Sequence, residues 1–527
     1  MKKKKDTIDL TKGSVAKGIV AFTIPLIFGQ LLQQLYNMAD AWVVGNFADN
    51  TAFAAVSTSG SLVFLVVGMF NGIAIGGGVV ISRYVGAEDE KNIERSIHTN
   101  ILFGIIASVL MTAIGLIFAP QILNMMDVPE NVLPQSLTYF KIYFAGSATI
   151  IMYNIFMSIM RALGDSVRPM YYLAICSAVN VVLDLIFVAV FHWGVAGAAI
   201  ATVIAQGLSA VLCILRMRKN QGCTRVSIKK LKYHAHIMGD VIRQGLPAGI
   251  QNSVISIGNL VVQTNINSFG EYAMSGAGSH SKVEGFVFIP IMAMSLTMST
   301  FISQNLGAKE YERAKKGAIF GIVSCAVVAA VIGIVEYIYA PWLVGIFAKA
   351  PKAAEFGVIQ ERTVCLFYFL LAFSHSATGV LRGCGKSVIP MATMLGFWCG
   401  FRIVYVTIAI RIVPVFKTIC WAYPITWSLS SLVFLLFLFC MEPFHFPGKG
   451  LICPEFPEKD QGINTGNAHN GKNNPGHSSE CAEEVADQVK FKKTDESPVN
   501  SSNDDQYQSC NVKPVPFHVN SSFREAA

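Results

Sequence analysis

The chain has 527 residues, of which 53% are hydrophobic and only 14% are charged, and its mean hydropathy is +0.49. A soluble domain of this length does not have such a composition, so the sequence predicts an all-α integral membrane protein. The net charge of +8 does not indicate nucleic-acid binding, because the Lys and Arg residues lie in short clusters between apolar segments, where they orient a membrane protein.

Twelve apolar segments follow one another, each long enough for a helix that crosses a bilayer. The first six cover roughly 18–45, 52–81, 97–119, 136–160, 169–191 and 196–215, and the second six cover roughly 246–269, 283–302, 317–338, 358–381, 388–410 and 420–440. They predict two six-helix lobes, at 18–215 and 246–440, with a basic N-terminus at 1–17, an interlobe linker at 216–245 and a disordered polar tail at 441–527. Lys and Arg are concentrated in the loops on the N-terminal side, so we expect both termini to lie in the cytosol.

The first segment contains one carboxylate, Asp40, in the stretch IPLIFGQLLQQLYNMADAWVVG. An acid at such a depth costs about 2.5 to 3.5 kcal/mol on insertion scales and is a candidate functional residue. Gln30, Gln33, Asn37 and Asp40 recur at spacings of three, four and three, which places them on one helical face. That face is predicted to line a wet interior. The alternative is a structural role for Asp40, paired between helices.

An internal repeat divides the chain. ISRYVGAEDEKNIERS from Ile81 matches ISQNLGAKEYERAKKG from Ile302, and RALGDSVRPM from Arg161 matches RGCGKSVIPM from Arg382, at the same separation of 221 residues. An even number of spans per copy predicts two parallel six-helix repeats, with the substrate bound between them. Pro25 and Pro247 occupy matching places early in the two copies and are predicted hinges.

A second intramembrane acid, Asp184, lies in the fifth segment, one helical turn after Asn180. Asp40, Asp184 and Thr202 are predicted to lie at similar depth and to converge on one cation, a proton or sodium. The alternative for Asp184 is an ordinary interhelical hydrogen bond.

The corresponding second-half positions carry no acid: they are Val262, Phe401 and Tyr405. We therefore expect the ion site in the first half. Glu336 is expected at the membrane interface, and Arg402 is expected either to close a helix end or to snorkel towards the interface. Asn154 either lines the cavity or makes an interhelical hydrogen bond.

The motifs in residues 14–440 resemble the multidrug and toxic compound extrusion (MATE) family, above all through IPLIFGQLLQQLYNMADAWVVG, ISRYVGAEDE and RALGDSVRP. In its DinF-type branch, an Asp on helix 1, an Asn and an Asp on helix 5 and a Thr on helix 6 form the cation network. The matching residues here are Asp40, Asn180, Asp184 and Thr202. The other branch carries a Glu in helix 7, where this chain has Gln251, and the usual Thr or Ser after the first Asp is Ala41. The long tail is not typical of the family.

The resemblance implies a proton- or sodium-coupled antiporter that exports organic cationic and aromatic compounds across the plasma membrane by alternating access. It implies no enzymatic activity and no cofactor, a monomer surrounded by lipid, and a substrate cavity lined by Gln33, Tyr36, Asn37 and Asn154. Two alternatives remain. A flippase for lipid-linked sugars, from the same superfamily, would be favoured by a markedly basic cavity, which the first-half helices do not show. An intramembrane aspartyl protease would require YD and GxGD motifs, which the sequences around Asp40 and Asp184 do not match.

Overall fold

The computed structural model describes residues 7–47, 50–124, 132–348 and 350–440, apart from the side chains of 50–67, 122, 439 and 440. These residues belong to one compact unit, and within them the regular structure is entirely helical. The predicted disordered tail at 441–527 and the first six residues of the predicted basic N-terminus lie outside the described residues.

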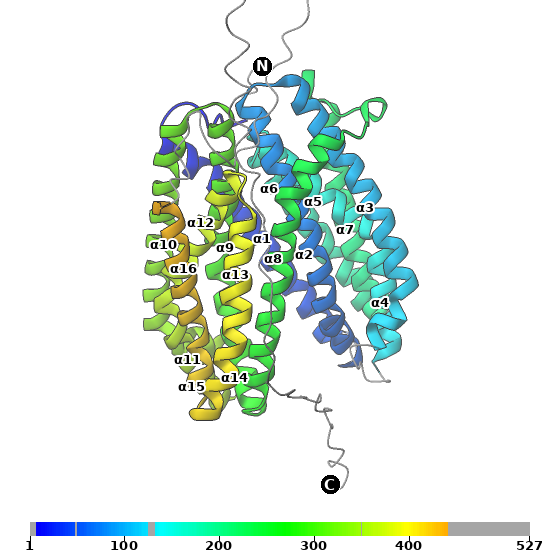
Figure 1. Cartoon of the computed structure of the whole chain (residues 1–527). Coiled ribbons are helices and arrows are strands. Elements are labelled where there is room, and N and C mark those ends of the chain that lie inside the picture. The colour runs from blue at the N-terminus through cyan, green and yellow to red at the C-terminus, as the bar shows by residue number, and fades with distance from the viewer. Residues whose placement is uncertain (1–6, 48–49, 125–131, 349, 441–527) are drawn as a thin grey trace, which may run out of the picture. The chain divides into compact units, whose positions relative to one another are not determined.

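The twelve predicted passes are all present within the described residues, several of them as helices broken once (Figure 1). The first half contains α1 (Val15–Phe47), α2 (Asn50–Gly86), α3 (Glu90–Asn124), α4 (Leu133–Ala145) with α5 (Ser147–Ala162), α6 (Val167–Asp184) with the π-helix η1 (Leu185–Val190), and α7 (Gly194–Arg218). Two short 3₁₀ turns, η2 (Gly222–Thr224) and η3 (Ile228–Lys230), connect the halves.

The second half repeats this arrangement. It contains α8 (Ala235–Asn267), α9 (Glu271–Gly307), α10 (Tyr311–Phe347), α11 (Pro351–Val364) with η4 (Cys365–Phe367) and α12 (Tyr368–Gly383), α13 (Val388–Met394) with the π-helix η5 (Leu395–Phe401) and α14 (Arg402–Ile412), and α15 (Phe416–Cys420) with α16 (Ala422–Cys440).

Length and hydropathy identify these helices as membrane spans. Nine spans among the described residues are long and apolar enough to cross a bilayer, and the pair α4 and α5, bent by 49°, makes a tenth. α2 and α8, with 37 and 33 residues, complete the twelve by length. The outer faces are apolar, as on α10, where Val327, Val331, Ile334 and Ile338 are exposed. The chain is therefore a multi-pass membrane protein whose outer helix faces suit lipid.

The two halves meet where α2 packs against α8 (Figure 1). Both helices contribute glycines one turn apart. A Cβ atom on Gly72 would lie 2.1 Å from the backbone nitrogen of Gly249, and one on Gly76 would lie 2.4 Å from that of Gly245. The lack of side chains thus allows the two backbones to touch.

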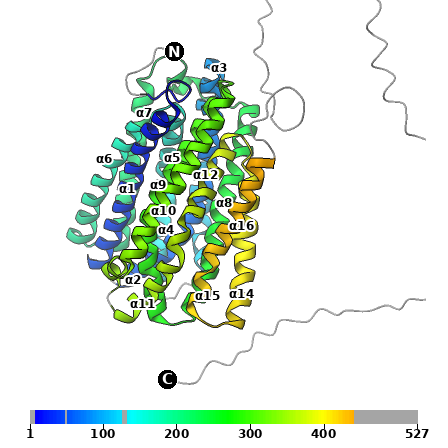
Figure 2. The same ribbon diagram turned by 90° about the vertical axis from the view of Figure 1, so that its left-hand side faces the viewer.

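α1 belongs to the first half by sequence, but it packs against both α6 of the first half and α9 of the second half (Figure 2). Its beginning contributes Ile19, Phe22 and Leu26 to the apolar cluster formed mainly by second-half helices. Its far end packs Val43 and Val44 against residues of η1 and α7. In addition, Thr23 Oγ1 donates to Thr297 Oγ1 of α9 at 2.9 Å. Pro25 lies near the end of the first of these two parts of α1, next to Leu26.

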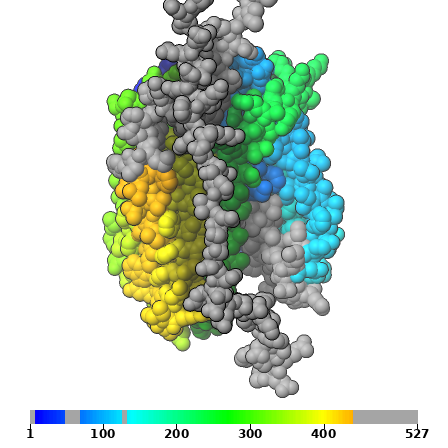
Figure 3. Space-filling view, in the orientation of Figure 1, coloured from blue at the N-terminus to red at the C-terminus, as the bar shows by residue number. Residues whose placement is uncertain are grey.

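The end of the bundle at which α1 begins carries many arginines and is called the basic end below; they are Arg83, Arg161, Arg216, Arg313 and Arg382. Contacts between the halves are concentrated there. Ser303 Oγ donates to the carbonyl oxygen of Val79 at 2.7 Å, and Gln304 Nε2 donates to that of Ala162 at 2.9 Å. The halves are therefore closed against each other at the basic end. On the face of the molecule that Figure 3 shows, the last helices of the second half (yellow and orange) lie on one side and helices of the first half (blue and cyan) on the other.

Candidate cation site

Asp40 of α1 and Asp184 of α6 face each other inside the first half. α1 packs along α6, and the two carboxyl groups lie close enough to interact. The side chain of Asp184 is completely buried and that of Asp40 is half-buried. Among the described residues, neither oxygen of Asp184 has a hydrogen-bond partner, and Oδ1 of Asp40 has none. Two unpaired carboxyl groups in an apolar medium require a proton or another cation between them.

The backbone around Asp184 is unusual. Asp184 is the last residue of α6, and the chain continues as the π-helix η1, in which the amide of Phe191 bonds to the carbonyl oxygen of Ile186 at 2.9 Å. π-Helical turns are rare and are frequent at functional sites. The sequence predicted one uninterrupted helix over 169–191, because hydrophobic periodicity contains no signal for the wider turn.

Asn180 and Thr202 add polar groups on the neighbouring turn and helix. Asn180 is 1% exposed, and neither its amide oxygen nor its amide nitrogen has a partner within the described part of the chain. Thr202 is also buried, on α7, which packs against α6. Carboxylate, amide and hydroxyl oxygens are the ligands that hard cations take, so these residue types suit sodium as well as a proton. The described residues contain no group of three or more His, Cys, Asp or Glu side chains placed to hold a metal ion.

Two tyrosines interact with the aspartates, and a third stacks on one of these two. Tyr36 and Tyr139 interact electrostatically with Asp40, and Tyr139 also interacts with Asp184. Tyr139 and Tyr143 of α4 stack with their ring centroids 5.9 Å apart. Tyr36 was predicted from the sequence as a cavity residue, whereas Tyr139 and Tyr143 were not. The signal was present as two tyrosines four residues apart in LTYFKIYF, which share a helical face.

The other predicted cavity residues are less closely connected with the aspartates. Gln33 is half-buried and Asn37 is exposed. Asn154 is half-buried, and its Nδ2 donates to the carbonyl oxygen of Ile150 in its own helix at 2.9 Å. Of the two predicted hinge prolines, Pro25 is half-buried and Pro247 is buried.

The structure contradicts the expectation that buried acids occur in the first half alone. Glu336, expected at the interface, is 6% exposed, because α10 continues for eleven more residues to Phe347, roughly 16 Å. Glu361 is completely buried beside it.

Arg402, expected to close a helix end or to snorkel, is also buried inside the second half, at 1% exposure. Its guanidinium group donates to Asn259 Oδ1 at 2.8 Å and to Thr426 Oγ1 at 2.9 Å. It also lies against the rings of Trp398 and Tyr423. These hydrogen bonds and ring contacts explain how a charged side chain is accommodated here.

Gln251 lies in the region where one branch of the family that the sequence resembles has a Glu. Both ends of its amide group contact neighbouring side chains. Its Oε1 accepts from Arg382 Nη2 at 2.8 Å, and its Nε2 contacts the Met394 sulfur at 2.6 Å.

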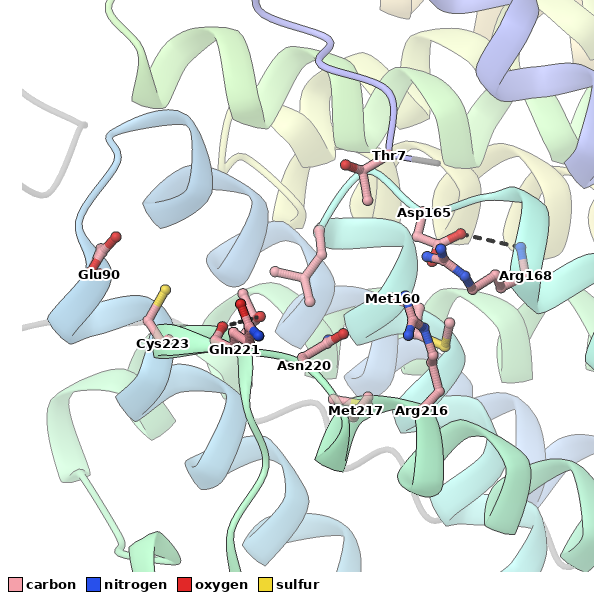
Figure 4. A pocket seen from close by; sticks show the side chains of 13 residues that line it. Thr7, Glu90, Met160, Asp165, Arg168, Arg216, Met217, Asn220, Gln221 and Cys223 are labelled. Carbon is pink, nitrogen blue, oxygen red and sulfur yellow. Dashed lines mark hydrogen bonds and ion pairs between the residues drawn. The ribbon is translucent and has the colours of Figure 1, made fainter. Parts of the chain in front are cut away.

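A pocket of about 380 Å³ lies at the basic end of the first half (Figure 4). Asp165 and Arg168, which form an ion pair at 2.5 Å, line it together with Arg216. Arg168 lies in the first turn of α6 and Asp184 ends this helix, so the pocket and the aspartates are roughly 24 Å apart along the helix. The pocket is therefore separate from the candidate cation site.

Comparison with known proteins identifies a transporter family model that matches both halves of the chain, and several similar proteins. The MatE family model matches residues 25–186 and 247–408, one match in each half. The chain is 26% identical over 392 residues to "Probable multidrug resistance protein YpnP" of Bacillus subtilis, covering 74% of this chain and 87% of that protein. It is 23% identical over 431 residues to "Multidrug export protein MepA" of Staphylococcus aureus, covering 82% and 95%.

Solved structures show the same fold. One is described as the "Outward-facing conformation of a multidrug resistance MATE family transporter of the MOP superfamily", with a TM-score of 0.79 and 20% identity over 84% of this chain and 99% of that one. A MOP superfamily transporter from Pyrococcus furiosus, described as having a binding pocket of reverse polarity, gives the same values.

Proposed function

The chain belongs to the MatE family of membrane transporters, and from this membership we propose that it is a cation-coupled antiporter that exports organic compounds. Relatives whose names describe multidrug resistance and multidrug export support drugs and other toxic compounds as the substrates. The stacked Tyr139 and Tyr143 beside two carboxyl groups favour aromatic and cationic compounds, since aromatic faces attract cations.

The observation that carries ion coupling is the contact between Asp40 and Asp184 inside a membrane-spanning bundle. A proton or a sodium ion binds to this pair, with Asn180 and Thr202 as further ligands. Binding neutralises the charge that would otherwise hold a cationic substrate, so the substrate is released. Gln33, Tyr36, Asn37 and Asn154 complete the substrate cavity in this proposal.

α1 transmits the effect of cation binding from Asp40 to the contact between the two halves. Because its first part packs against the second half and its last part carries Asp40, a movement about Pro25 alters the contact between the halves. Pro247 lies between Gly245 and Gly249, the two glycines of α8 that touch α2, and acts as the corresponding hinge. The halves then rock about a central site, as in other transporters built from repeats.

The proposal places the basic end in the cytosol, and with it both termini, in accordance with the positive-inside rule. In this orientation the closed basic end corresponds to an outward-facing state. We propose that the protein acts as a monomer in the plasma membrane, needs no cofactor and takes its energy from a gradient of protons or sodium ions.

The test is efflux of cationic dyes from inside-out vesicles or proteoliposomes carrying the purified protein, driven by an imposed proton gradient or sodium gradient separately. Dye transport driven by either gradient is expected, and Asp40→Asn is expected to abolish it. Glu271→Gln, which neutralises an exposed carboxylate at the start of α9, is the matched control and should transport normally. Unchanged transport in Asp40→Asn would disprove the coupling role.

A flippase for lipid-linked sugars is the remaining alternative. Within the described residues, no Lys or Arg is among the groups that interact with the two aspartates, so the site lacks the basic character such a substrate requires. If no cationic dye were transported under either gradient, while a fluorescent lipid-linked sugar crossed the bilayer, the flippase would replace the exporter.

A further inference from the structure

The second half contains a cluster of titratable side chains that the proposed mechanism does not use. The second-half cluster consists of His280 and Glu284 on α9, Glu336 on α10 and Glu361 on α11. His280, Glu336 and Glu361 are 2%, 6% and 0% exposed, and Glu284 is partly buried. Charged side chains at such depth in a membrane protein are costly and therefore need a reason.

The contacts inside the cluster connect three helices. His280 Nδ1 lies 2.6 Å from Glu361 Oε2, and the carboxyl groups of Glu361 and Glu336 lie close enough to interact. Two carboxyl groups that interact in a buried, apolar site cannot both be ionised at low cost, so one of them is expected to hold a proton. The pair therefore implies a bound proton.

Unpaired atoms mark the same place. Among the described residues, Oε2 of Glu336 and Oε1 of Glu361 have no hydrogen-bond partner, and neither has the hydroxyl group of Tyr368, which is completely buried. Tyr368, on α12, also interacts with both glutamates. The cluster thus combines buried acceptors with a donor that the present arrangement leaves unused.

A count of charges gives the same result. His280 is paired with Glu361, and Glu284 interacts with Arg402. If all three glutamates were ionised and His280 and Arg402 were both charged, the anions would exceed the cations by one. An uncompensated charge in a membrane interior is strongly unfavourable, so one further cation is required.

Within the described part of the chain, the elements packed against the cluster do not supply that cation. η4 contributes Cys365, whose thiol interacts with Glu361 and Glu336. α15 also packs against α11, but its titratable residues, Lys417 and Cys420, interact with each other. The balance is therefore made by a small exchangeable ion.

We propose that Glu336 and Glu361 bind one exchangeable proton in the second half, and that His280 is the residue that positions Glu361. The site is distinct from the Asp40 and Asp184 pair, which lies in the other half and on other helices. Through this site, the pH on one side of the membrane would change the protonation of the second half independently of the first half. Its existence does not depend on the exported substrate.

Infrared spectroscopy of the purified full-length protein in lipid nanodiscs tests the site directly. The C=O stretching band of a protonated carboxyl group is recorded during a pH titration in KCl, in H₂O and in D₂O. Glu336→Gln is expected to remove one component of this band. In the unsubstituted protein that component should shift in D₂O, which shows exchange, and should decline as the pH rises.

Three comparisons make the result decisive. Glu361→Gln should remove the same component, and Glu336→Gln provides the answer if Glu361→Gln fails to fold. Glu355→Gln, which neutralises an exposed carboxylate on the same helix as Glu361, should leave the component unchanged. Asp40→Asn should also leave the component unchanged. The test of the second-half site is therefore independent of the test of the proposed exporter.

The proposal would be overturned if neither glutamine variant altered the band, because neither carboxyl group would then hold a proton. A component that did not exchange in D₂O and did not change with pH would also overturn it, since it would indicate a fixed structural hydrogen bond. Loss of the component when NaCl replaces KCl at constant pH would equally overturn it, because sodium would then be the preferred occupant.

Discussion

Gly72 of α2 and Gly249 of α8 approach so closely that a Cβ atom on Gly72 would lie 2.1 Å from the backbone nitrogen of Gly249. The atoms in the way belong to the backbone, which cannot move aside as a flexible side chain does. This contact lies in the half of both helices nearer the basic end, where hydrogen bonds also join the two halves. The closed state of the basic end therefore depends on the absence of side chains at the two glycines.

Gly72→Ala is expected to push α2 and α8 apart and to lower stability by about 1 to 3 kcal/mol, the usual cost of overpacking. The measurement is the apparent melting temperature of the purified protein in detergent. Gly278→Ala is the control, because a Cβ atom at Gly278 would meet nothing within 4 Å. An equal melting temperature for Gly72→Ala and the unsubstituted protein would show that the helices do not need this contact.

Arg402→Met is expected to destabilise the second half by about 3 to 5 kcal/mol, as is typical when one partner of a buried charged network is removed. It removes the donors to Asn259 and Thr426 and leaves Glu284 without its cationic neighbour. The melting temperature again provides the measurement, and Arg411→Met, an exposed arginine on the same helix, is the control. If both variants melted alike, the hydrogen bonds of Arg402 would not be structural.

The twelve passes and the repeat were predictable from the sequence because apolar length alone defines a membrane span, and because two motifs recur at one separation. The approach of Asp40 to Asp184 was predictable from their depth. The packing of the first part of α1 against the second half was not, since hydrophobicity does not reveal which apolar neighbour a helix selects.

The second-half cluster escaped prediction for a related reason. Glu361 is the fourth residue of the predicted segment 358–381, close to its start, and the sequence analysis did not single it out. In the structure α11 begins at Pro351 and continues through η4 into α12, which places Glu361 inside the span. Its contacts with His280 and Glu336 come from helices distant in sequence, and no local pattern encodes them.

Asp240, in the first turns of α8 before its membrane-spanning part, is expected to make stability depend on pH. Burial raises the pKa of its carboxyl group above the ordinary value, although the nearby His236 opposes the shift. The folded state therefore binds more protons than the unfolded state between the two pKa values, and stability falls as the pH rises through that window.

Asp240→Asn should therefore be more stable than the unsubstituted protein at neutral pH and should lose this pH dependence. Melting temperatures measured from pH 4 to pH 8 provide the check, with the exposed Glu312→Gln at the same end as the control. If stability instead rose with pH in the unsubstituted protein and the asparagine variant removed that rise, the carboxylate would be stabilising in its charged form.

Tyr139→Phe tests whether the tyrosines beside the aspartates take part in ion-coupled export. The variant keeps the ring stacked on Tyr143 but removes the hydroxyl group, which interacts electrostatically with Asp40 and Asp184. Loss of one polar group beside the ion site is expected to cost about 0.5 to 1.5 kcal/mol, so gradient-driven dye efflux should fall about two- to tenfold. Tyr171→Phe, which alters an exposed tyrosine on α6, should transport normally. A normal rate in Tyr139→Phe, together with a loss in Asp40→Asn, would assign the ring to substrate contact alone and leave the ion site to the two carboxyl groups.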